Sequence, residues 1–194
     1  MIWFTADCHI GHANIIKYAF RPYNSIEEMN QSIIDNWNKV VRSDDLVYVL
    51  GDFILSNNIY EVKQILDSLR GSIVLLRGDH DKASIELYPE RFKSIHSLLE
   101  LKFSGYPSII LCHYCLRVWK KSHFNSWHLY AHSHSHLPSI GKSHDVGVDN
   151  NKFTPISLLE IVEIMKWKED NFNLIKPKKR NKNELEQLEM EFKW

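Results

Sequence analysis

The order of apolar and amphipathic segments in the first 76 residues restricts this chain to a small set of folds. Between short apolar runs, residues 26–41 and 59–71 carry apolar side chains at intervals of three and four, which places them on one face of a helix. The apolar runs have the length of buried strands and occupy residues 1–6, 45–52 and 72–76. This alternation predicts a mostly parallel sheet with helices packed against it and right-handed crossovers.

The second half of the chain predicts further strands, some of them antiparallel. Residues 97–103 and 108–114 have the pattern of a hairpin joined by a turn that contains glycine and proline. Short strands are predicted at 127–136 and 144–149, and a helix at 156–165. Together with the first half, these segments predict an α/β fold with mixed sheets.

Two helix boundaries carry recognisable signals. Ser25 followed by Glu28 is typical of a capping box at the start of the first helix. Gly71 is the kind of residue that ends a helix, and we expect it to end the second one.

The chain has 194 residues, which suits one domain with a sizeable core. The composition becomes polar from about Phe172, so we expect a domain over residues 1–172 and a charged extension over residues 173–194. A solvated tail is the usual explanation for its basic run at 176–183, with a nucleic-acid-binding or nuclear-import patch as the alternative. Residues 184–194 have the pattern of a short charged helix able to pair with another chain.

The composition gives no sign of a membrane or of a strongly charged partner. Lys plus Arg and Asp plus Glu each number 24, so the formal net charge is zero and no global field attracts nucleic acid. No apolar run approaches the ~20 residues that a membrane-spanning helix needs. Cys8, Cys112 and Cys115 are too few for a disulfide framework, and no second pair completes a zinc site with the last two. We therefore expect a cytoplasmic protein.

Side chains able to bind metal follow the predicted strands. They are Asp7 and His9, then Asp52, then Asp79, His80 and Asp81, then His113, and finally His132 and His134. Ligands bind beyond the carboxyl ends of strands in such sheets, so we expect these side chains to converge. Residues two apart share a direction on an extended segment, which would aim Asp7 and His9 at one ion and turn Cys8 into the core. Carboxylates mixed with imidazoles suit Mn, Fe, Zn, Ni or Co. Seven of these nine side chains are expected to be ligands, which is too many for one ion and implies two.

The motifs "DCH", "GD", "GDHD", "CH" and "AHSH" occur in that order between Asp7 and His134, over about two-thirds of the chain. This series resembles the calcineurin-like metallophosphoesterases, whose pattern is D-x-H, G-D, G-N-H-[D/E], H and G-H-x-H. The stretches "DCHIGHANII", "WHLYAHSHSH" and "DVGVD" are similar to a small bacterial and phage branch of that family. The resemblance implies a four-layer αββα sandwich of the metallo-dependent phosphatase type.

The resemblance also implies a role for each motif residue. The first metal would take Asp7, His9 and His134; the second would take His113, His132 and Asp79; and Asp52 would bridge them. His80 would protonate the leaving group, and Asp81 beside it would fix its tautomer. The implied reaction is hydrolysis of a phosphoester by a hydroxide that bridges two divalent ions, with Mn²⁺ favoured.

Two positions depart from the family pattern. Asp79 stands where the family has asparagine, which adds a negative charge that could hold a divalent ion more firmly, repel an anionic substrate or lower activity. Ala131 replaces the glycine before His132, which constrains only the backbone there.

The sequence is compatible with several classes of phosphoester substrate. The core leaves little room for a large cap, so we expect an open site that admits phosphodiesters, including nucleotides and nucleic-acid ends, as well as monoesters. We favour a phosphodiesterase over a phosphatase. A protein-interaction scaffold that keeps the fold is one alternative, and a nuclease that uses a basic groove is another. The sequence leaves the oligomeric state undetermined.

Residues outside the motifs give weaker hypotheses. Arg117 and His12 are candidates for substrate binding, with Arg117 placed to contact the phosphate. A structural role is at least as well supported for both. Asp149 is predicted to support the histidine loop through hydrogen bonds. A structural role is at least as well supported for four further polar residues, which are Asn14, His123, His128 and His136.

Overall fold

The computed structural model describes residues 1–175 and contains two sheets packed face to face. The first sheet has the order β4-β3-β2-β1-β9, and all its pairs are parallel except β1 with β9. Its strands are β1 (Ile2–Thr5), β2 (Leu46–Val49), β3 (Ser72–Leu76), β4 (Phe92–His96) and β9 (Ile156–Ser157). The second sheet has the order β5-β6-β7-β8, with only β5 and β6 antiparallel. Its strands are β5 (Leu98–Leu101), β6 (Ile109–Cys112), β7 (Trp127–Tyr130) and β8 (Ser143–Asp145).

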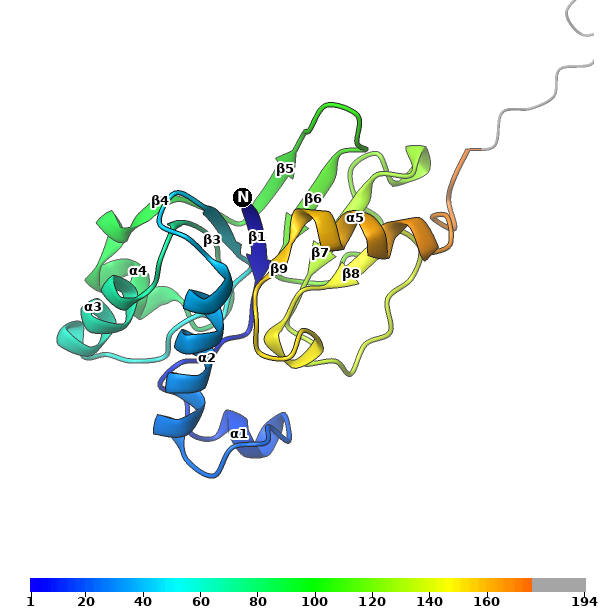
Figure 1. The fold of residues 1–194 in the computed structure, drawn as a ribbon. Helices are drawn as coiled ribbons and strands as arrows, with labels where there is room; N and C mark the ends of the chain where they lie inside the picture. Colours follow the sequence, from blue (N-terminus) through cyan, green and yellow to red (C-terminus); the bar gives the residue numbers. More distant parts are fainter. Residues whose placement is uncertain (176–194) are drawn as a thin grey trace, which may run out of the picture.

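The helices lie mainly against the first sheet. Figure 1 shows α2, α3 and α4 on one side of β1 and β3, with β5 to β8 on the other side. The helices are α1 (Ile15–Tyr18), α2 (Ile26–Val40), α3 (Ile59–Ser68), α4 (Lys82–Leu87) and α5 (Leu158–Trp167). Short 3₁₀ turns are η1 (Pro89–Arg91), η2 (Ser122–Phe124) and η3 (Val148–Asn150). The predicted α/β sandwich of mixed sheets is confirmed.

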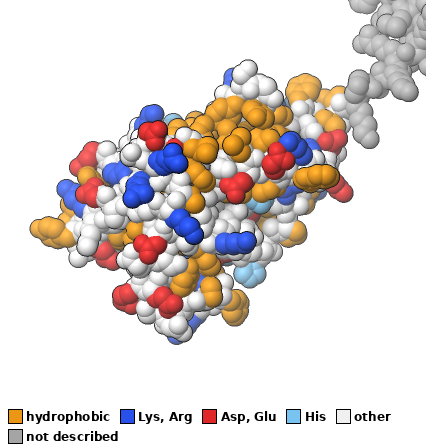
Figure 2. All heavy atoms as spheres, in the orientation of Figure 1, with side chains coloured by type: hydrophobic (Ala, Val, Ile, Leu, Met, Phe, Trp, Pro, Cys, Tyr) orange, Lys and Arg blue, Asp and Glu red, His pale blue; other side chains and the backbone are white. Residues whose placement is uncertain are grey.

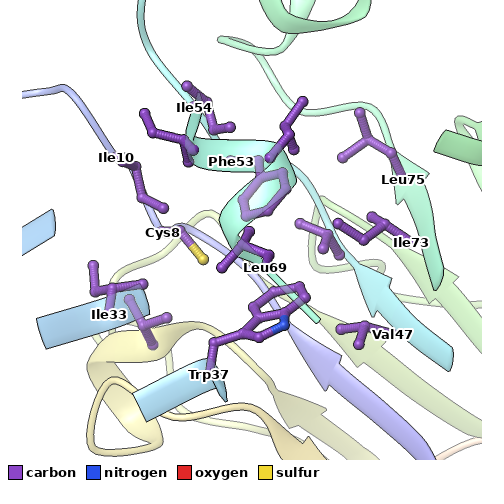
Figure 3. Close-up of a cluster of buried hydrophobic side chains, with 14 of the residues drawn as sticks. Cys8, Ile10, Ile33, Trp37, Val47, Phe53, Ile54, Leu69, Ile73 and Leu75 are labelled. Atoms are coloured by element: carbon purple, nitrogen blue, oxygen red, sulfur yellow. The ribbon is translucent and has the colours of Figure 1, made fainter. Parts of the chain in front are cut away.

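Two hydrophobic clusters separate these layers. One lies between the helices and the first sheet, where Trp37 of α2 stacks on Phe53 with ring centroids 5.8 Å apart (Figure 3). Val47 and Ile73 of the sheet lie beside them in the same view. The other cluster lies between the two sheets and also receives Ile161 of α5. Each face of the first sheet is therefore buried, as the near-continuous apolar runs of its strands predict.

The outer face of the second sheet has an irregular cover. Trp119 lies against the His128 ring at 5.2 Å between centroids, and the Tyr130 hydroxyl donates to the Leu137 carbonyl. His128 is fully buried there, its Nδ1 bonded to a backbone carbonyl, and the Leu116 amide donates to its Nε2. His128 is therefore structural, and loops with η2 form the fourth layer.

The predicted strands and helices of the first 76 residues are present, but several boundaries differ. The Ser25 side chain accepts from the Glu28 amide, whereas the Glu28 carboxylate accepts from the Asn24 amide, so only half of the predicted capping box forms. A complete capping box joins Ser157 and Glu160 at the start of α5. Ile156 and Ser157 pair with β1 as β9, and Ser157 is the extended N-cap, so the helix predicted from residue 156 begins two residues later.

Strand β4 was absent from the sequence prediction. Only Phe92 of its residues is buried, so the run lacks the apolar composition that marks β1 to β3. Its place in the sheet comes from parallel pairing with β3, which local sequence does not record. The predicted hairpin is confirmed as β5 paired with β6.

The last described residues pack against the second sheet's cover. The Asn171 side chain donates to the carbonyls of Ser122 and Ser126, and the Ile175 amide donates to the His123 carbonyl. The predicted extension therefore makes contacts as far as residue 175. Its basic run and its candidate helix lie outside the described residues.

Charges of both signs are interspersed over the face shown in Figure 2, in keeping with the net charge of zero. No helix among residues 1–175 is long and apolar enough to cross a membrane.

We predict that Trp37→Ala lowers the free energy of unfolding by about 3–5 kcal/mol, because it opens a cavity and leaves the Arg70 carbonyl without its indole donor. Urea denaturation followed by circular dichroism measures this loss. Trp167→Ala is the matched control, because Trp167 is 89% exposed at the end of α5 and should change stability by less than about 0.5 kcal/mol. Equal effects of the two substitutions would contradict the assignment of Trp37 to the core.

Candidate metal centre

The loops after five strands bring the predicted side chains to one edge of the sandwich. Because β1, β2 and β3 are parallel neighbours, the loops that follow them leave the sheet side by side. The Asp7 amide donates to the Gly51 carbonyl at 3.0 Å, and the His9 amide donates to the Asp52 carbonyl at 2.9 Å. The loop after β7 joins them, since the His132 amide donates to Asp7 Oδ2 at 2.8 Å. Both sheets thus contribute loops to one site.

Two groups of three side chains lie within reach of a metal ion. One contains Asp7, His9 and His134, and the other contains Asp52, His113 and His132. In each group, one ligand atom from every residue lies within 4.8 Å of the others. Asp52 lies between the groups, because its Oδ2 is 3.5 Å from His9 Nε2 and 3.7 Å from His113 Nε2. The structure therefore brings together six of the seven predicted ligands.

Five of these six residues have left-handed backbone conformations. The φ angles are +52° at Asp7, +50° at His9 and Asp52, +72° at His132 and +45° at His134. Residues other than glycine rarely adopt this region, and such strain concentrates at functional sites. Because β1 already ends at Thr5, these turns direct Asp7 and His9 to one group. The extended geometry from which the sequence predicted their shared direction is wrong, although Cys8 between them is buried as expected.

The donor set fits a divalent cation. Asp7 and His9 are buried, yet Asp7 Oδ1 and His9 Nε2 have no hydrogen-bond partner among the described residues. Burial raises the pKa of Asp7 well above its usual range, and the charges of Asp145 and Asp52 raise it further. Burial also lowers the pKa of His9 to about 2, with a further contribution from His134. A buried carboxyl group among other acids ionises readily only beside a cation, and a neutral imidazole keeps a lone pair for a metal, so both side chains suit a metal ion.

A second set of contacts orients the imidazoles. His134 Nδ1 lies 2.8 Å from Asp149 Oδ2, and a carboxylate oxygen can only accept, so this nitrogen carries the proton. His113 Nδ1 likewise donates to the Leu50 carbonyl at 2.7 Å. In both rings the opposite nitrogen, Nε2, is then left with its lone pair for a metal. The predicted support of the histidine loop by Asp149 is confirmed.

Arg21 anchors this second set and was not predicted. Its guanidinium donates to both carboxylate oxygens of Asp149, at 2.8 and 3.0 Å, and to the backbone carbonyls of Asp7 and Cys8. Burial raises the pKa of Asp149, but the hydrogen bonds from His134 and Arg21 outweigh it and lower that pKa overall. No local pattern marks Arg21, because the oxygen atoms that accept from it belong to residues that are 13 to 128 positions away.

Two glycines allow the loops to approach closely. A Cβ atom on Gly51 would lie 2.5 Å from His113 Nδ1, and one on Gly78 would overlap the Asp52 side chain. Gly51 also has φ of +90°, a conformation that side chains disfavour. The "GD" and "GDHD" motifs therefore need their glycines for packing as well as their carboxylates for chemistry.

Asp79 lies at the rim of the second group. Its Oδ2 is 3.7 Å from His132 Nδ1, and both side chains are 49% exposed. The Tyr114 hydroxyl donates to Asp79 Oδ1. This hydrogen bond lowers the pKa of Asp79 and raises that of Tyr114 to about 12. Asp79 thus stands next to the group of three without belonging to it, and Tyr114 is a second neighbour that the sequence did not reveal.

His80 lies beside both histidines of the first loop. Its ring centroid is 5.5 Å from that of His9 and 6.0 Å from that of His12, and its amide donates to Asp52 Oδ1 at 3.0 Å. The ring is exposed and faces the centre from the solvent side. This position suits the predicted contact with a bound substrate.

Asp81 does not orient the His80 ring as predicted. It is fully buried, and its carboxylate accepts from the amides of Asp52, Phe53 and Gly78 at 2.7 to 3.0 Å. Burial raises its pKa, although these hydrogen bonds oppose the change. Its oxygens are occupied with the backbone, so Asp81 ties the loop after β2 to the loop after β3.

The two predicted substrate residues differ in position. His12 Nδ1 lies 3.2 Å from His9 Nδ1, so His12 belongs to the site. Arg117 instead lies over the Phe172 ring at 4.8 Å, beside a cavity of about 190 Å³ in the outer cover. Its predicted contact with phosphate has no support in this arrangement. The other weak candidates are placed in local contacts: Asn14 precedes α1, His123 packs on Phe124, and His136 Nδ1 lies near the Ser133 carbonyl.

Comparison with known proteins decides the family. The profile described as calcineurin-like phosphoesterase matches residues 1–187. The chain belongs to the calcineurin-like phosphoesterase family. It is 38% identical over 176 residues to the uncharacterized protein MJ1445 of Methanocaldococcus jannaschii, an alignment that covers 84% of this chain and 90% of that protein.

Two further relatives agree with this family. The Gene 66 protein of Mycobacterium phage L5 is 30% identical over 81 residues, which are 41% of this chain and 39% of the phage protein. The crystal structure of the protein of unknown function AQ665 from Aquifex aeolicus has a TM-score of 0.65 and 28% identity, over 84% of this chain and 98% of that one. The resemblance to a family with a small phage-type member is confirmed. Family and donor groups together make this chain a metal-dependent phosphoesterase.

We predict that Asp149→Asn weakens Mn²⁺ binding by about 10- to 100-fold, because the His134 ring loses the charged acceptor that orients it. Calorimetric titration of metal-stripped protein measures the change. Asp35→Asn on the exposed face of α2 is the matched control and should bind Mn²⁺ as the unmodified protein does. Unchanged affinity in Asp149→Asn would contradict a role for this carboxylate in the metal centre.

Proposed function

We propose that this protein is a dinuclear metal-dependent phosphodiesterase. The observation that carries the proposal is the position of the Asp52 carboxylate between two groups of ligands, one around Asp7 and one around His113. In this proposal Asp7, His9 and His134 hold one ion, and His113 and His132 hold the other with Asp79. Asp52, which lies between the groups, would serve both ions. Mn²⁺ is the metal that we favour among those that suit a mixture of carboxylates and imidazoles.

Divalent cations, when bound, supply positive charge against the phosphoryl oxygens and lower the pKa of water at the site. The chain itself orients the ligands. His134 and His113 are fixed by Asp149 and by the Leu50 carbonyl, so their Nε2 atoms face the centre without rearrangement. Ligands oriented in advance stabilise charge more strongly where water is excluded, as it is on the buried side of this site.

His80 is proposed to deliver a proton to the leaving oxygen. Its backbone is held by Asp52, while its ring remains exposed where a substrate would enter. A well-placed imidazole acid contributes about 10²–10⁴ to the rate of such a reaction. His12, in contact with His9, is proposed to bind a substrate oxygen from the same side.

The preference for diesters rests on charge and exposure. Asp79 adds a carboxylate at the rim where the family has asparagine, and this charge opposes a phosphomonoester dianion more than a phosphodiester monoanion. The exposed side chains of Asp79, His80 and His132 leave this side of the site open to a substrate with groups on both ends. The scaffold alternative is less well supported, because six of the seven predicted ligands converge in the two groups. On the face in Figure 2, Lys and Arg side chains are interspersed with Asp and Glu, so this view lends no support to the nuclease alternative.

The direct test is hydrolysis of bis(p-nitrophenyl) phosphate and p-nitrophenyl phosphate by metal-stripped protein, with Mn²⁺, Zn²⁺, Ni²⁺ or Mg²⁺ added back. We predict that Mn²⁺ restores hydrolysis and that the diester is the better substrate. His80→Asn should lower kcat by about 10²–10⁴ and still bind Mn²⁺, because only the proton donor is lost. His96→Asn is its matched control, since His96 bonds to Ser94 on β4.

Asp52→Asn provides the complementary outcome. The amide has one ligand oxygen, so it should weaken binding of both ions and abolish turnover together. If no metal restores hydrolysis while Mn²⁺ still binds, the enzyme proposal fails and the scaffold alternative gains support. A higher kcat/KM for the monoester would overturn the diester preference alone.

A further inference from the structure

The hydrogen bond between Tyr114 and Asp79 joins the two sheets at the rim of the site. Asp79 follows β3 of the first sheet, and Tyr114 follows β6 of the second. Tyr114 is held in place by the second group itself, because its ring packs edge-on against His113 and His132 with centroids 5.0 and 5.1 Å away. The phenol is therefore fixed by two imidazoles of the second group, one of which, His132, Asp79 also faces.

The bond determines how Asp79 presents its carboxylate. One oxygen, Oδ1, accepts from Tyr114, and the other, Oδ2, faces His132 Nδ1 at 3.7 Å. An exposed carboxylate without a partner would rotate freely and offer either oxygen or both to a cation. With the phenol in place, only one oxygen is directed toward the second group. This is the way in which an asparagine presents its single amide oxygen.

We propose that Tyr114 is a positioning residue that makes an aspartate suitable at position 79. The hydroxyl occupies one carboxylate oxygen, orients the other toward the second metal and draws part of the negative charge away from the substrate. An asparagine at this position needs no such donor, because its amide nitrogen can face the solvent. Aspartate and tyrosine thus act as a pair in this chain, and the effect of either depends on the other.

This inference rests on the proposed function for its catalytic meaning, but its test uses metal binding. Calorimetric titration with Mn²⁺ is performed on metal-stripped unmodified protein, Tyr114→Phe, Asp79→Asn and the double variant. We expect Tyr114→Phe to weaken Mn²⁺ binding at the second group by about 10- to 100-fold, which is the usual effect of removing a residue that orients a metal ligand. The double variant should bind within about threefold of Asp79→Asn, because the amide does not depend on the hydroxyl.

Two controls separate positioning from damage. Tyr106→Phe removes a hydroxyl of similar exposure from the turn between β5 and β6, and should leave both Mn²⁺ affinities unchanged. Circular dichroism melts of all variants should stay close to that of the unmodified protein, because Asp79 and Tyr114 are both on the surface.

Three outcomes overturn the inference. The first is a loss of Mn²⁺ affinity smaller than about threefold in Tyr114→Phe. The second is an equal loss of affinity with and without the Asp79→Asn substitution. The third is a loss confined to the Mn²⁺ held by the first group. An equal loss in both backgrounds would mean that the hydroxyl acts without Asp79. Because binding is measured directly, a protein that hydrolyses neither nitrophenyl ester still gives a clear answer here. Failure of the inference is thus distinguishable from failure of the proposed function.

Discussion

The burial of the Asp7 carboxylate is the constraint on which the site depends. This side chain has no exposure, one of its oxygens is bonded only to the His132 amide, and the other has no partner in the described chain. Asp52, Asp145 and Asp149 place three more acidic groups nearby, and their charges act on Asp7. Arg21 is the cation that the described chain places among them, and its side chain already pairs with Asp149. Negative charge buried without compensation is unfavourable, and bound cations would remove that cost.

The surrounding loops are built to hold this charge in place. Asp81 receives three backbone amides and joins the loop after β2 to the loop after β3. Those bonds fix Asp52 and His80 relative to each other, although one is buried and the other is exposed. Gly51 and Gly78 let the same loops touch the second sheet. Left-handed turns at the ligands are then tolerated because the neighbouring contacts leave them no alternative.

Much of this arrangement could be predicted from the sequence, because parallel strands place their carboxyl ends at one edge. The residues after the strands follow from this rule. The sharing of Asp7 and His9 by one group was also expected, but from an extended backbone that the left-handed turns at both residues replace. The left-handed turns, the role of Asp81 and the contacts of Arg21 could not be predicted in the same way. Each depends on backbone amides or side chains that are distant in sequence, and no local spacing records them. β4 could not be predicted for a similar reason, since its pairing with β3 defines it and its own residues lack the apolar pattern of a buried strand.

The two ligand groups differ in their exposure to water, so one side of the centre is closed and the other is open. Asp7 and His9 of the first group are closed in by the sandwich, whereas His132 of the second group and the neighbouring Asp79 are half exposed beside Tyr114. Electrostatic interactions are stronger where water is excluded, so the first group should hold its cation more tightly than the second. A substrate must then approach over the second group, where His80 is also exposed. The charge of Asp79 meets every incoming anion at that point, and the Tyr114 hydroxyl is the group that moderates it.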